Sequence, residues 1–133
     1  KLSQPLLDRL DLCADVSPVD FDGMSNGKIG ENTKQVRMRV EAAQQIQRER
    51  FKDEKIQFNG EMSGKQVENF CHLDDSAGRL LKMAFQHMPF SARAYHRILK
   101  VARTIADLEG KDRIGVEHLG QALFFRNQNV LRE

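Results

Sequence analysis

Residues 91–108 read SARAYHRILKVARTIADL, and this stretch decides the fold that the sequence predicts. At about 100° per residue its apolar side chains fall within one narrow arc. They are Tyr95, Ile98, Leu99, Ala102, Ile105 and Ala106. The basic side chains fall on the opposite arc and are Arg93, Arg97, Lys100 and Arg103. Ser91 is a favourable N-cap and Gly110 a common terminator, so the stretch predicts an amphipathic helix that packs its apolar face against a core.

Other amphipathic stretches predict four more helices around this one. Ser63 stands where an N-cap is expected, and Asp74 and Asp75 place negative charge where it favours a helix N-terminus. The longest predicted helix shows apolar residues at near-helical spacing, with arginine and glutamine filling its other face. The predicted helices cover residues 34–52, 63–72, 74–88 and 115–127. The fold class is therefore predicted to be all-α, a bundle of about five helices within residues 34–133.

Residues 1–33 follow a different pattern. Residues 1–10 predict a short helix whose first turn accommodates Pro5. Residues 10–16 alternate between apolar and polar, which predicts a strand that has no partner in this chain and is therefore loose. Glycines and a proline in residues 17–33 predict a flexible linker. We expect residues 1–16 to be the remnant of another domain, because the chain starts without methionine inside an amphipathic element.

Length, charge and cysteine content narrow the possible functions. The chain has 133 residues, enough for one core of ordinary size. Its 21 basic and 19 acidic residues give a formal charge of +2, too small to indicate a nucleic-acid or membrane partner by itself. No apolar run approaches the roughly 18 to 20 residues of a membrane-spanning helix, which predicts a cytoplasmic protein without a membrane partner. Cys13 and Cys71 lie far apart without a pairing pattern, which favours reduced thiols.

No self-sufficient active site is visible in the sequence. Residues 23–29 and 60–66 resemble a phosphate-binding loop, but both have three residues between their glycines and no hydroxyl after the lysine. Cys71 beside His72 is most simply a buried thiol near a helix end. The histidines, His72, His87, His96 and His118, show no metal-ligand spacing. We therefore predict no metal site in this chain and no catalysis by the chain alone.

Two arginine-bearing segments resemble a known family. PLLDRLDL, residues 5–12, places Arg9 at the end of a short helix directly before the predicted strand, and residues 91–108 place Arg93 in the first turn of a helix. Together they are similar to the C-terminal part of magnesium-chelatase-like AAA+ ATPases, with a closer similarity to the ComM or YifB branch. The similarity covers essentially the whole chain; it includes residues 71–74, 80–81 and 118–123 and departs at residues 88–90 and 124–126.

The resemblance implies roles for two arginines. Arg9 corresponds to the finger that reaches across a subunit interface to the neighbour's ATP. Arg93 corresponds to the second sensor, which contacts nucleotide from the helical lid. Arginine suits both roles, because its planar guanidinium stays charged and can bind two phosphate oxygens at once. Without the resemblance, Arg9 would be a solvated arginine paired with Asp8 or Asp11, and Arg93 an exposed charge in a basic stripe.

The resemblance also implies what the parent protein does. Residues 34–133 would be the helical lid of a AAA+ ATPase, and residues 1–16 a remnant of its nucleotide-binding core. The parent would bind ATP and Mg²⁺ and hydrolyse ATP in a homo-oligomeric ring of neighbouring subunits. This chain lacks the phosphate-binding loop, so alone it is expected to be inactive and to bind no cofactor. ComM-like members are ring-forming motors associated with DNA branch migration, so DNA is an expected partner.

Two alternatives and two groups of charged residues stay open at this point. The first alternative is the ATPase subunit of magnesium chelatase, which drives metal insertion into a porphyrin. The second is a helical protein-interaction module with no nucleotide role. The stripe of Arg97, Lys100 and Arg103 could face nucleotide, a neighbouring subunit or DNA. The arginines of the long helix are expected to form a solvated face; they are Arg37, Arg39, Arg48 and Arg50.

Overall fold

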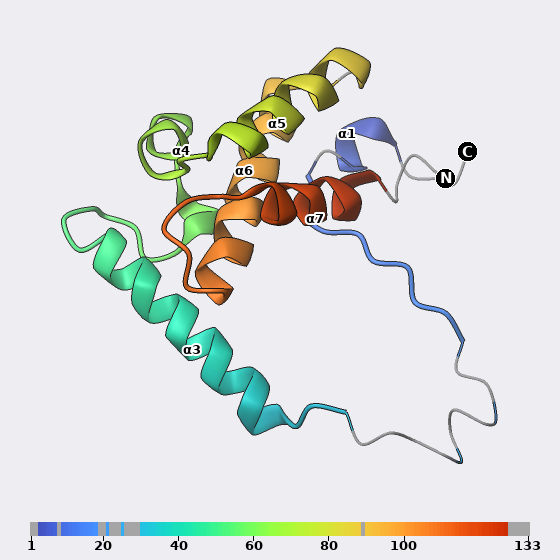
Figure 1. Ribbon diagram of the computed structural model, residues 1–133, viewed down its shortest axis with the longest axis vertical. Helices are drawn as coiled ribbons and strands as arrows, with labels where there is room; N and C mark the ends of the chain where they lie inside the picture. Colours follow the sequence, from blue (N-terminus) through green and yellow to red (C-terminus); the bar gives the residue numbers. More distant parts are fainter. Residues whose placement is uncertain are drawn as a thin grey trace.

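The computed structural model describes residues 3–7, 9–18, 21, 25, 30–88 and 90–127. Their regular structure is helical, as Figure 1 shows. The helices are α1 (Gln4–Leu7), α3 (Thr33–Arg50), the 3₁₀ turn η1 (Asn59–Glu61), α4 (Gly64–Phe70), α5 (Asp75–His87), α6 (Ala92–Leu108) and α7 (Val116–Asn127). Within these residues the β-type pairing is an isolated bridge between Leu73 and Ile114. The predicted all-α bundle is therefore confirmed, with helix bounds close to those expected.

Polar N-caps explain where the main helices begin. The hydroxyl of Ser91 accepts a hydrogen bond from the backbone N–H of Ala94 at 3.1 Å, directly before α6. Asn32 and Ser63 cap α3 and α4 in the same way, and the glutamine three residues later accepts from the backbone N–H of each cap. These reciprocal bonds satisfy N–H groups that have no partner inside the helix. The sequence signals at Ser63 and Ser91 are therefore confirmed as caps.

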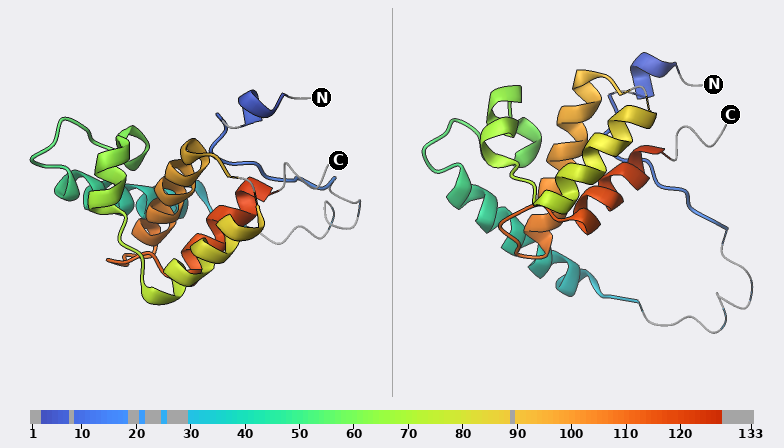
Figure 2. Two further views of the ribbon diagram at one scale, coloured as in Figure 1. Left: turned by 90° about the horizontal axis from the view of Figure 1, so that it is seen from above. Right: turned by 45° about the horizontal axis from the view of Figure 1, so that its top comes forward.

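Helix α6 lies at the centre of the packed domain. Figure 2 shows it between α3 and α4 on one side and α5 and α7 on the other, and it contacts α3, α4, α7 and η1. Its buried apolar side chains recur every three or four residues, so the predicted apolar arc faces the core. They are Ala94, Ile98, Leu99, Ala102 and Ala106. Gly110 follows α6 with a φ of 65°, a left-handed conformation that glycine adopts without steric cost.

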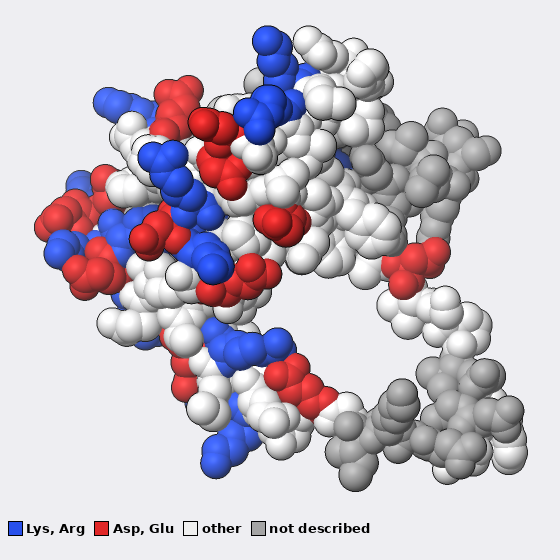
Figure 3. All heavy atoms as spheres, in the orientation of Figure 1, with Lys and Arg blue, Asp and Glu red and all other residues white. Residues whose placement is uncertain are grey.

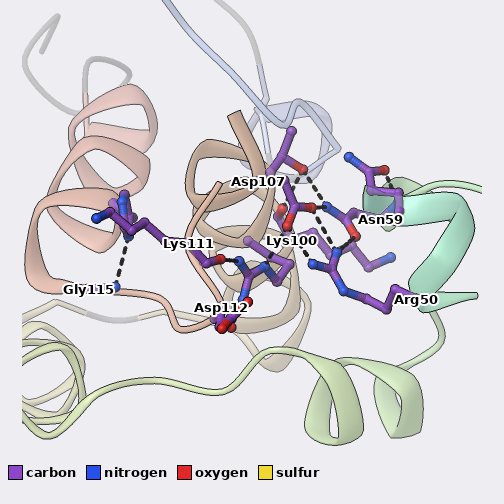
Figure 4. A network of polar contacts seen from close by, with 11 residues as sticks. Arg50, Asn59, Lys100, Asp107, Lys111, Asp112 and Gly115 are labelled. Atoms are coloured by element: carbon purple, nitrogen blue, oxygen red, sulfur yellow. Dashed lines mark hydrogen bonds and ion pairs between the residues drawn. The ribbon is translucent and has the colours of Figure 1, made fainter. Parts of the chain in front are cut away.

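A buried polar cluster ties the end of α3 to the end of α6 (Figure 4). Arg50, the last residue of α3, donates hydrogen bonds to both carboxylate oxygens of Asp107, at 2.8 and 2.5 Å. Arg103 donates to the same carboxylate at 3.1 Å, and Asn59 of η1 donates to it at 2.8 Å. Arg103 also donates to the backbone carbonyls of two residues after α6, Lys111 and Asp112. This cluster therefore joins three separate segments through one carboxylate.

Two sequence-based assignments of arginines are wrong. Arg103 does not lie with the solvent-facing basic residues, because its guanidinium turns toward Asp107 and its side chain is only 1% exposed. Arg50 does not belong to a solvated face of α3, since its side chain is 14% exposed and paired with Asp107. Helical periodicity fixes the direction in which a side chain leaves the backbone. It does not fix where the end of a long, flexible arginine side chain lies.

The first half of α3 projects from the packed domain. Residues 33–42 are all exposed, whereas later turns of the helix contact α6. Arg37 pairs with Glu41 at 2.7 Å, and Arg39 pairs with Glu31 at 2.6 Å, so acidic and basic side chains lie side by side along the helix (Figure 3). The predicted solvated face is confirmed for these two arginines. Neither α3 nor any other helix of the described residues is long and apolar enough to span a membrane.

The N-terminal segment contacts the helical domain at a few points. Residues 12–18 form neither a helix nor a strand ladder, as expected for a predicted strand over residues 10–16 that has no partner in this chain. The physical reason is that the described residues offer no neighbouring strand to complete a sheet. The backbone N–H of Cys13 donates to the carbonyl oxygen of Phe125 at 3.1 Å, near the end of α7. Most of the predicted linker, residues 17–33, lies outside the described residues.

Candidate functional site

A cavity of about 760 Å³ lies along one side of α6. Helix α6 forms one wall from its first turn to its last. A second wall comes from η1 and the start of α4, and a third from the N-terminal segment together with the end of α7. The apolar part of the lining consists chiefly of Leu12, Met62, Val101, Ile105 and Phe125. The cavity is therefore built by segments that lie far apart in the sequence and meet only in the folded chain.

A row of basic side chains follows the α6 wall of this cavity. Arg93, Arg97 and Lys100 are spaced four and three residues apart, which places them on one face of the helix. Lys100 donates a hydrogen bond from Nζ to the carbonyl oxygen of Gly60 at 3.1 Å, across the cavity wall. The structure thus separates the predicted stripe into two parts: Arg97 and Lys100 line the cavity with Arg93, whereas Arg103 is buried in the polar cluster.

Arg93 lies at the start of α6, where the helix presents positive partial charge. It is the second residue of the helix after the Ser91 cap, and its side chain is exposed at the mouth of the cavity. Within the described residues its side chain forms no hydrogen bond or ion pair that neutralises it. The first backbone N–H groups of a helix and its macrodipole both favour a bound anion. Arg93 is therefore the charged group in the lining best placed to meet an incoming phosphate.

Arg9 lies outside the cavity. It occupies an exposed turn after α1, where its backbone N–H donates to the carbonyl oxygen of Leu6 at 3.0 Å. Asp8 lies outside the described residues, and the carboxylate of Asp11 binds Arg97. The chain therefore does not bring Arg9 and Arg93 into one site, as expected if the two arginines serve different sites.

The N-terminal segment contacts α6 through an ion pair and the end of α7 through hydrogen bonds of its backbone. Asp11 binds the guanidinium of Arg97 on α6. Arg126, near the end of α7, donates to the carbonyl oxygen of Leu10 at 3.1 Å. The backbone N–H of Cys13 donates a further hydrogen bond to the carbonyl oxygen of Phe125. Asp11 and Leu12 therefore form part of the cavity wall, in the segment where the sequence predicts a strand without a partner.

His96 fixes the contact between α6 and the start of α4. A Cβ atom added at Gly64 would lie 2.9 Å from Cε1 of His96, which is closer than real side chains approach. A larger residue at this position would therefore force the imidazole of His96 to shift away from the first turn of α4. The ring of His96 also lies against that of Tyr95, with centroids 5.6 Å apart. His96 lines the cavity between Arg93 and Arg97, so the same contact shapes the basic wall.

The other candidate groups from the sequence have structural roles or lie outside the described residues. Residues 60–66 form η1 and the cap of α4, and residues 23–29 are mostly outside the described part of the chain. Burial raises the pKa of the Cys71 thiol to about 11, so this cysteine is a poor nucleophile at neutral pH. Within the described residues, no group of His, Cys, Asp and Glu side chains comes together in a way that could hold a metal ion.

Sequence reasoning missed Asp11 and the glycine-rich wall of the site. The sequence indicates Asp11 only as a partner of Arg9, because the two are close in sequence. Its contact with Arg97 joins residues 86 positions apart, and no local sequence pattern predicts such a pair. The nearest available signal was the excess of arginines over nearby acids in residues 91–103, which left several cations without a local partner. In the sequence, Gly60 and Gly64 stand out only through their resemblance to a phosphate-binding loop.

These features define a class of domain: a helical bundle with a cationic cavity at the start of its central helix. The family described as magnesium chelatase, subunit ChlI C-terminal, matches residues 30–126. The chain belongs to this family, and the resemblance expected from its two arginine-bearing segments is confirmed. The match begins just before the Asn32 cap of α3 and extends into α7, to within one residue of the end of that helix.

Similar proteins come from several bacteria. The chain is 41% identical over 127 residues to competence protein ComM of Haemophilus influenzae, and 37% identical over 128 residues to the uncharacterized protein YifB of Salmonella typhimurium. Both matches cover 95% of this chain and 24% of the relative. An uncharacterized protein of Mycobacterium tuberculosis is 33% identical over 132 residues. The chain thus spans about a quarter of the length of the curated relatives it matches.

Proposed function

We propose that this chain is the helical lid of a AAA+ ATPase and that Arg93 contacts the nucleotide. The observation that supports this best is the cavity at the start of α6, where Arg93, Arg97 and Lys100 face an apolar wall. A nucleoside triphosphate has matching chemistry, since its phosphates need cations and its base needs apolar surface. Membership of the magnesium chelatase C-terminal family supports the same proposal.

Arg93 would act by compensating charge during phosphoryl transfer. Negative charge spreads over the phosphate oxygens in the transition state, and a positioned guanidinium stabilises it. The position of Arg93 in the first turn of α6 adds the favourable potential of the helix terminus. Mg²⁺ would enter with the phosphates, which together with carboxylates are its usual ligands. Residues of the parent protein outside this chain would supply those carboxylates and the phosphate-binding loop.

Arg9 would serve a neighbouring subunit rather than its own. It is exposed and lies outside the cavity of its own chain, which leaves it available to a partner. A finger arginine supplied in trans contributes about 10³ to 10⁵ in rate in related phosphoryl-transfer systems. In the parent protein, subunits bearing Arg9→Ala and subunits with a mutated phosphate loop should each be inactive alone and regain activity when mixed. Failure to regain activity would show that Arg9 does not act in trans.

A titration with ATP tests the role of Arg93 in this chain. Backbone amide shifts on adding ATP should cluster at the start of α6, and Arg93→Ala should weaken binding about tenfold or more, because a charge-assisted contact is lost. Arg48→Ala is the matched control, since Arg48 is an exposed arginine of α3 away from the cavity. Equal weakening by both substitutions would indicate a general charge effect and argue against a specific role for Arg93.

The biological role of the parent is proposed to be that of a DNA branch-migration motor that works as a ring in the cytoplasm. The 41% identity to a competence protein supports this proposal, and the match to a magnesium chelatase subunit keeps porphyrin metalation as the second candidate. ATP turnover of the parent should rise several-fold with branched DNA if the first role is right. Turnover indifferent to DNA would favour metalation, and absence of turnover would favour a helical interaction module.

A further inference from the structure

We infer that Asp11 and the phosphates of a nucleotide compete for Arg97, so that filling the cavity loosens the segment that contains Arg9. This inference rests on the proposed nucleotide role of the cavity. Arg97 lines the cavity, yet its guanidinium is already bound by Asp11 of the N-terminal segment. A carboxylate of the chain therefore occupies a cation that a phosphate would bind.

The ion pair between Asp11 and Arg97 is suited to being displaced. The side chain of Asp11 is 61% exposed, whereas that of Arg97 is 27% exposed. Water can therefore replace the arginine at the carboxylate with little penalty, and exposed ion pairs of this kind contribute little to stability. A triphosphate has several negative charges and can bind a guanidinium through two oxygens at once. A nucleotide in the cavity is thus the stronger ligand for Arg97.

Asp11 is also the acidic residue of the cavity lining. The other charged groups that line it come from α6 and are Arg93, Arg97 and Lys100, with His96 between them. Lys100 is engaged with the carbonyl of Gly60, and Arg93 has no such contact in the described residues. The two arginines are therefore the cations that a phosphate would bind first, and only Arg97 must exchange a partner.

Release of Asp11 would also loosen Arg9, because the two residues are close in the chain. Arg9 precedes Asp11 by two residues, and Asp11 is the side-chain attachment of this segment to α6. Further contacts of the segment include the hydrogen bond from Arg126 to the Leu10 carbonyl oxygen and the hydrogen bond from the Cys13 N–H to Phe125, both at the end of α7. A subunit with an empty cavity would hold its Arg9 segment against its own α6. A subunit with a filled cavity would free that segment for its neighbour.

The experiment compares three forms of this chain titrated with inorganic tripolyphosphate at constant ionic strength. The forms are the unchanged chain, Asp11→Asn, and Asp53→Asn as the matched control, because Asp53 is an exposed acid in the turn after α3. Asp11→Asn should bind about two- to five-fold more tightly than the unchanged chain, the range expected when one exposed ion pair no longer competes. Asp53→Asn should bind like the unchanged chain.

A second measurement separates competition from a general change of charge. In the unchanged chain, saturating tripolyphosphate should lower the hydrogen-exchange protection of the Cys13 amide, which donates to Phe125. In an Arg97→Gln background, Asp11→Asn should no longer tighten binding, because the contested cation is absent. If Asp11→Asn increased the affinity for tripolyphosphate equally with and without Arg97, the inference would be overturned. The same would follow if tripolyphosphate did not change the hydrogen-exchange protection of the Cys13 amide.

The outcomes also distinguish the inference from the proposed function. Shifts at Arg93 with equal affinities for the unchanged chain and Asp11→Asn would leave the nucleotide role standing and overturn the competition. Shifts absent from α6 in every form would overturn both, since no anion would then enter the cavity. Unchanged amide shifts of the α6 core in each variant check that the substitutions preserve the fold.

Discussion

Helix α6 makes ionic contacts in two regions that differ mainly in burial. Near its end, Arg103 pairs with Asp107, their side chains are 1% and 0% exposed, and Asp107 also pairs with Arg50. In its middle, Arg97 pairs with Asp11 across the cavity, with side chains 27% and 61% exposed. The same two residue types form both contacts. The buried contact holds α3 and α6 together, whereas in the exposed contact Arg97 can exchange Asp11 for a ligand.

The difference shows why the charge pattern of a helix does not reveal function by itself. A buried pair cannot lose one partner without leaving an uncompensated charge in the core. An exposed pair can, because water takes the place of the lost partner. The region suited to binding is therefore the one where charged side chains are paired only weakly.

The largest effect is expected from Asp107→Ala. The substitution leaves the buried guanidinium of Arg103 without its carboxylate and removes the partner of Arg50 and Asn59. Breaking a buried pair in this way destabilises a protein by about 3–5 kcal/mol. Urea unfolding followed by circular dichroism would measure the loss. Asp112→Ala is the control, because Asp112 is exposed and contributes its backbone carbonyl rather than its side chain to the cluster.

A small loss of stability in Asp107→Ala would contradict the contrast between the buried and the exposed ionic contacts of α6. If Asp107→Ala cost less than about 1 kcal/mol, the cluster would behave like an exposed pair. The difference between the two regions of α6 would then have to come from something other than burial. Comparable losses for Asp107→Ala and Asp112→Ala would lead to the same conclusion.

The second effect is a fall in stability at alkaline pH caused by Cys71. Burial raises the pKa of this thiol to about 11, so the folded state keeps the proton that an unfolded chain releases at about pH 8.5. The stabilising contribution is present below the unfolded pKa and is lost as pH rises through about 11. The loss should reach about 3 kcal/mol. Unfolding free energies of the unchanged chain and Cys71→Ala across this range would measure it, and parallel slopes would contradict the assignment.

The helices and their order could be predicted because their signals are local. The caps at Ser63 and Ser91 and the apolar arc of residues 95–106 define their elements within a few residues of sequence. The alternating pattern of residues 10–16 is equally local, but it forms no strand in the described residues, because a strand exists only with a partner. Burial of Arg103 and Arg50 could not be predicted, since both arginines depend on Asp107 and on segments folded around it.

Half of the candidate site could be predicted in the same sense. Arg93 follows from its place beside the Ser91 cap, and the structure puts it at the start of α6 as expected. The walls formed by Leu12, Gly60 and Phe125 could not be predicted, because they meet only through tertiary packing. The proposed roles of Arg9 and Arg93 come from the family resemblance and stay predictions until nucleotide binding is measured.

A third, smaller effect is expected at His118, which joins the two ends of the loop after α6. The backbone N–H of Gly115 donates to its Nδ1 at 2.8 Å, so Nε2 bears the hydrogen and donates to Glu109 at 2.8 Å. His118 thereby caps α7 from its third residue, a place usually taken by glutamate or glutamine. His118→Ala should cost about 1–2 kcal/mol, and His118→Gln clearly less, since glutamine restores the acceptor. Equal losses in urea unfolding would rule out the capping role.

The smallest effect on stability is expected from Asp11→Asn. Its ion pair with Arg97 is exposed on the carboxylate side, so the free energy of unfolding should change by less than about 1 kcal/mol. The same substitution frees Arg97 for an anion, so binding of tripolyphosphate should improve while stability barely moves. Asp107→Ala should lower stability strongly and leave the binding of tripolyphosphate by the folded chain nearly unchanged, because Asp107 lies in the core and not in the cavity lining. If Asp11→Asn instead destabilised the chain as much as Asp107→Ala, the N-terminal segment would be an integral part of the fold, and ligand binding could not release it.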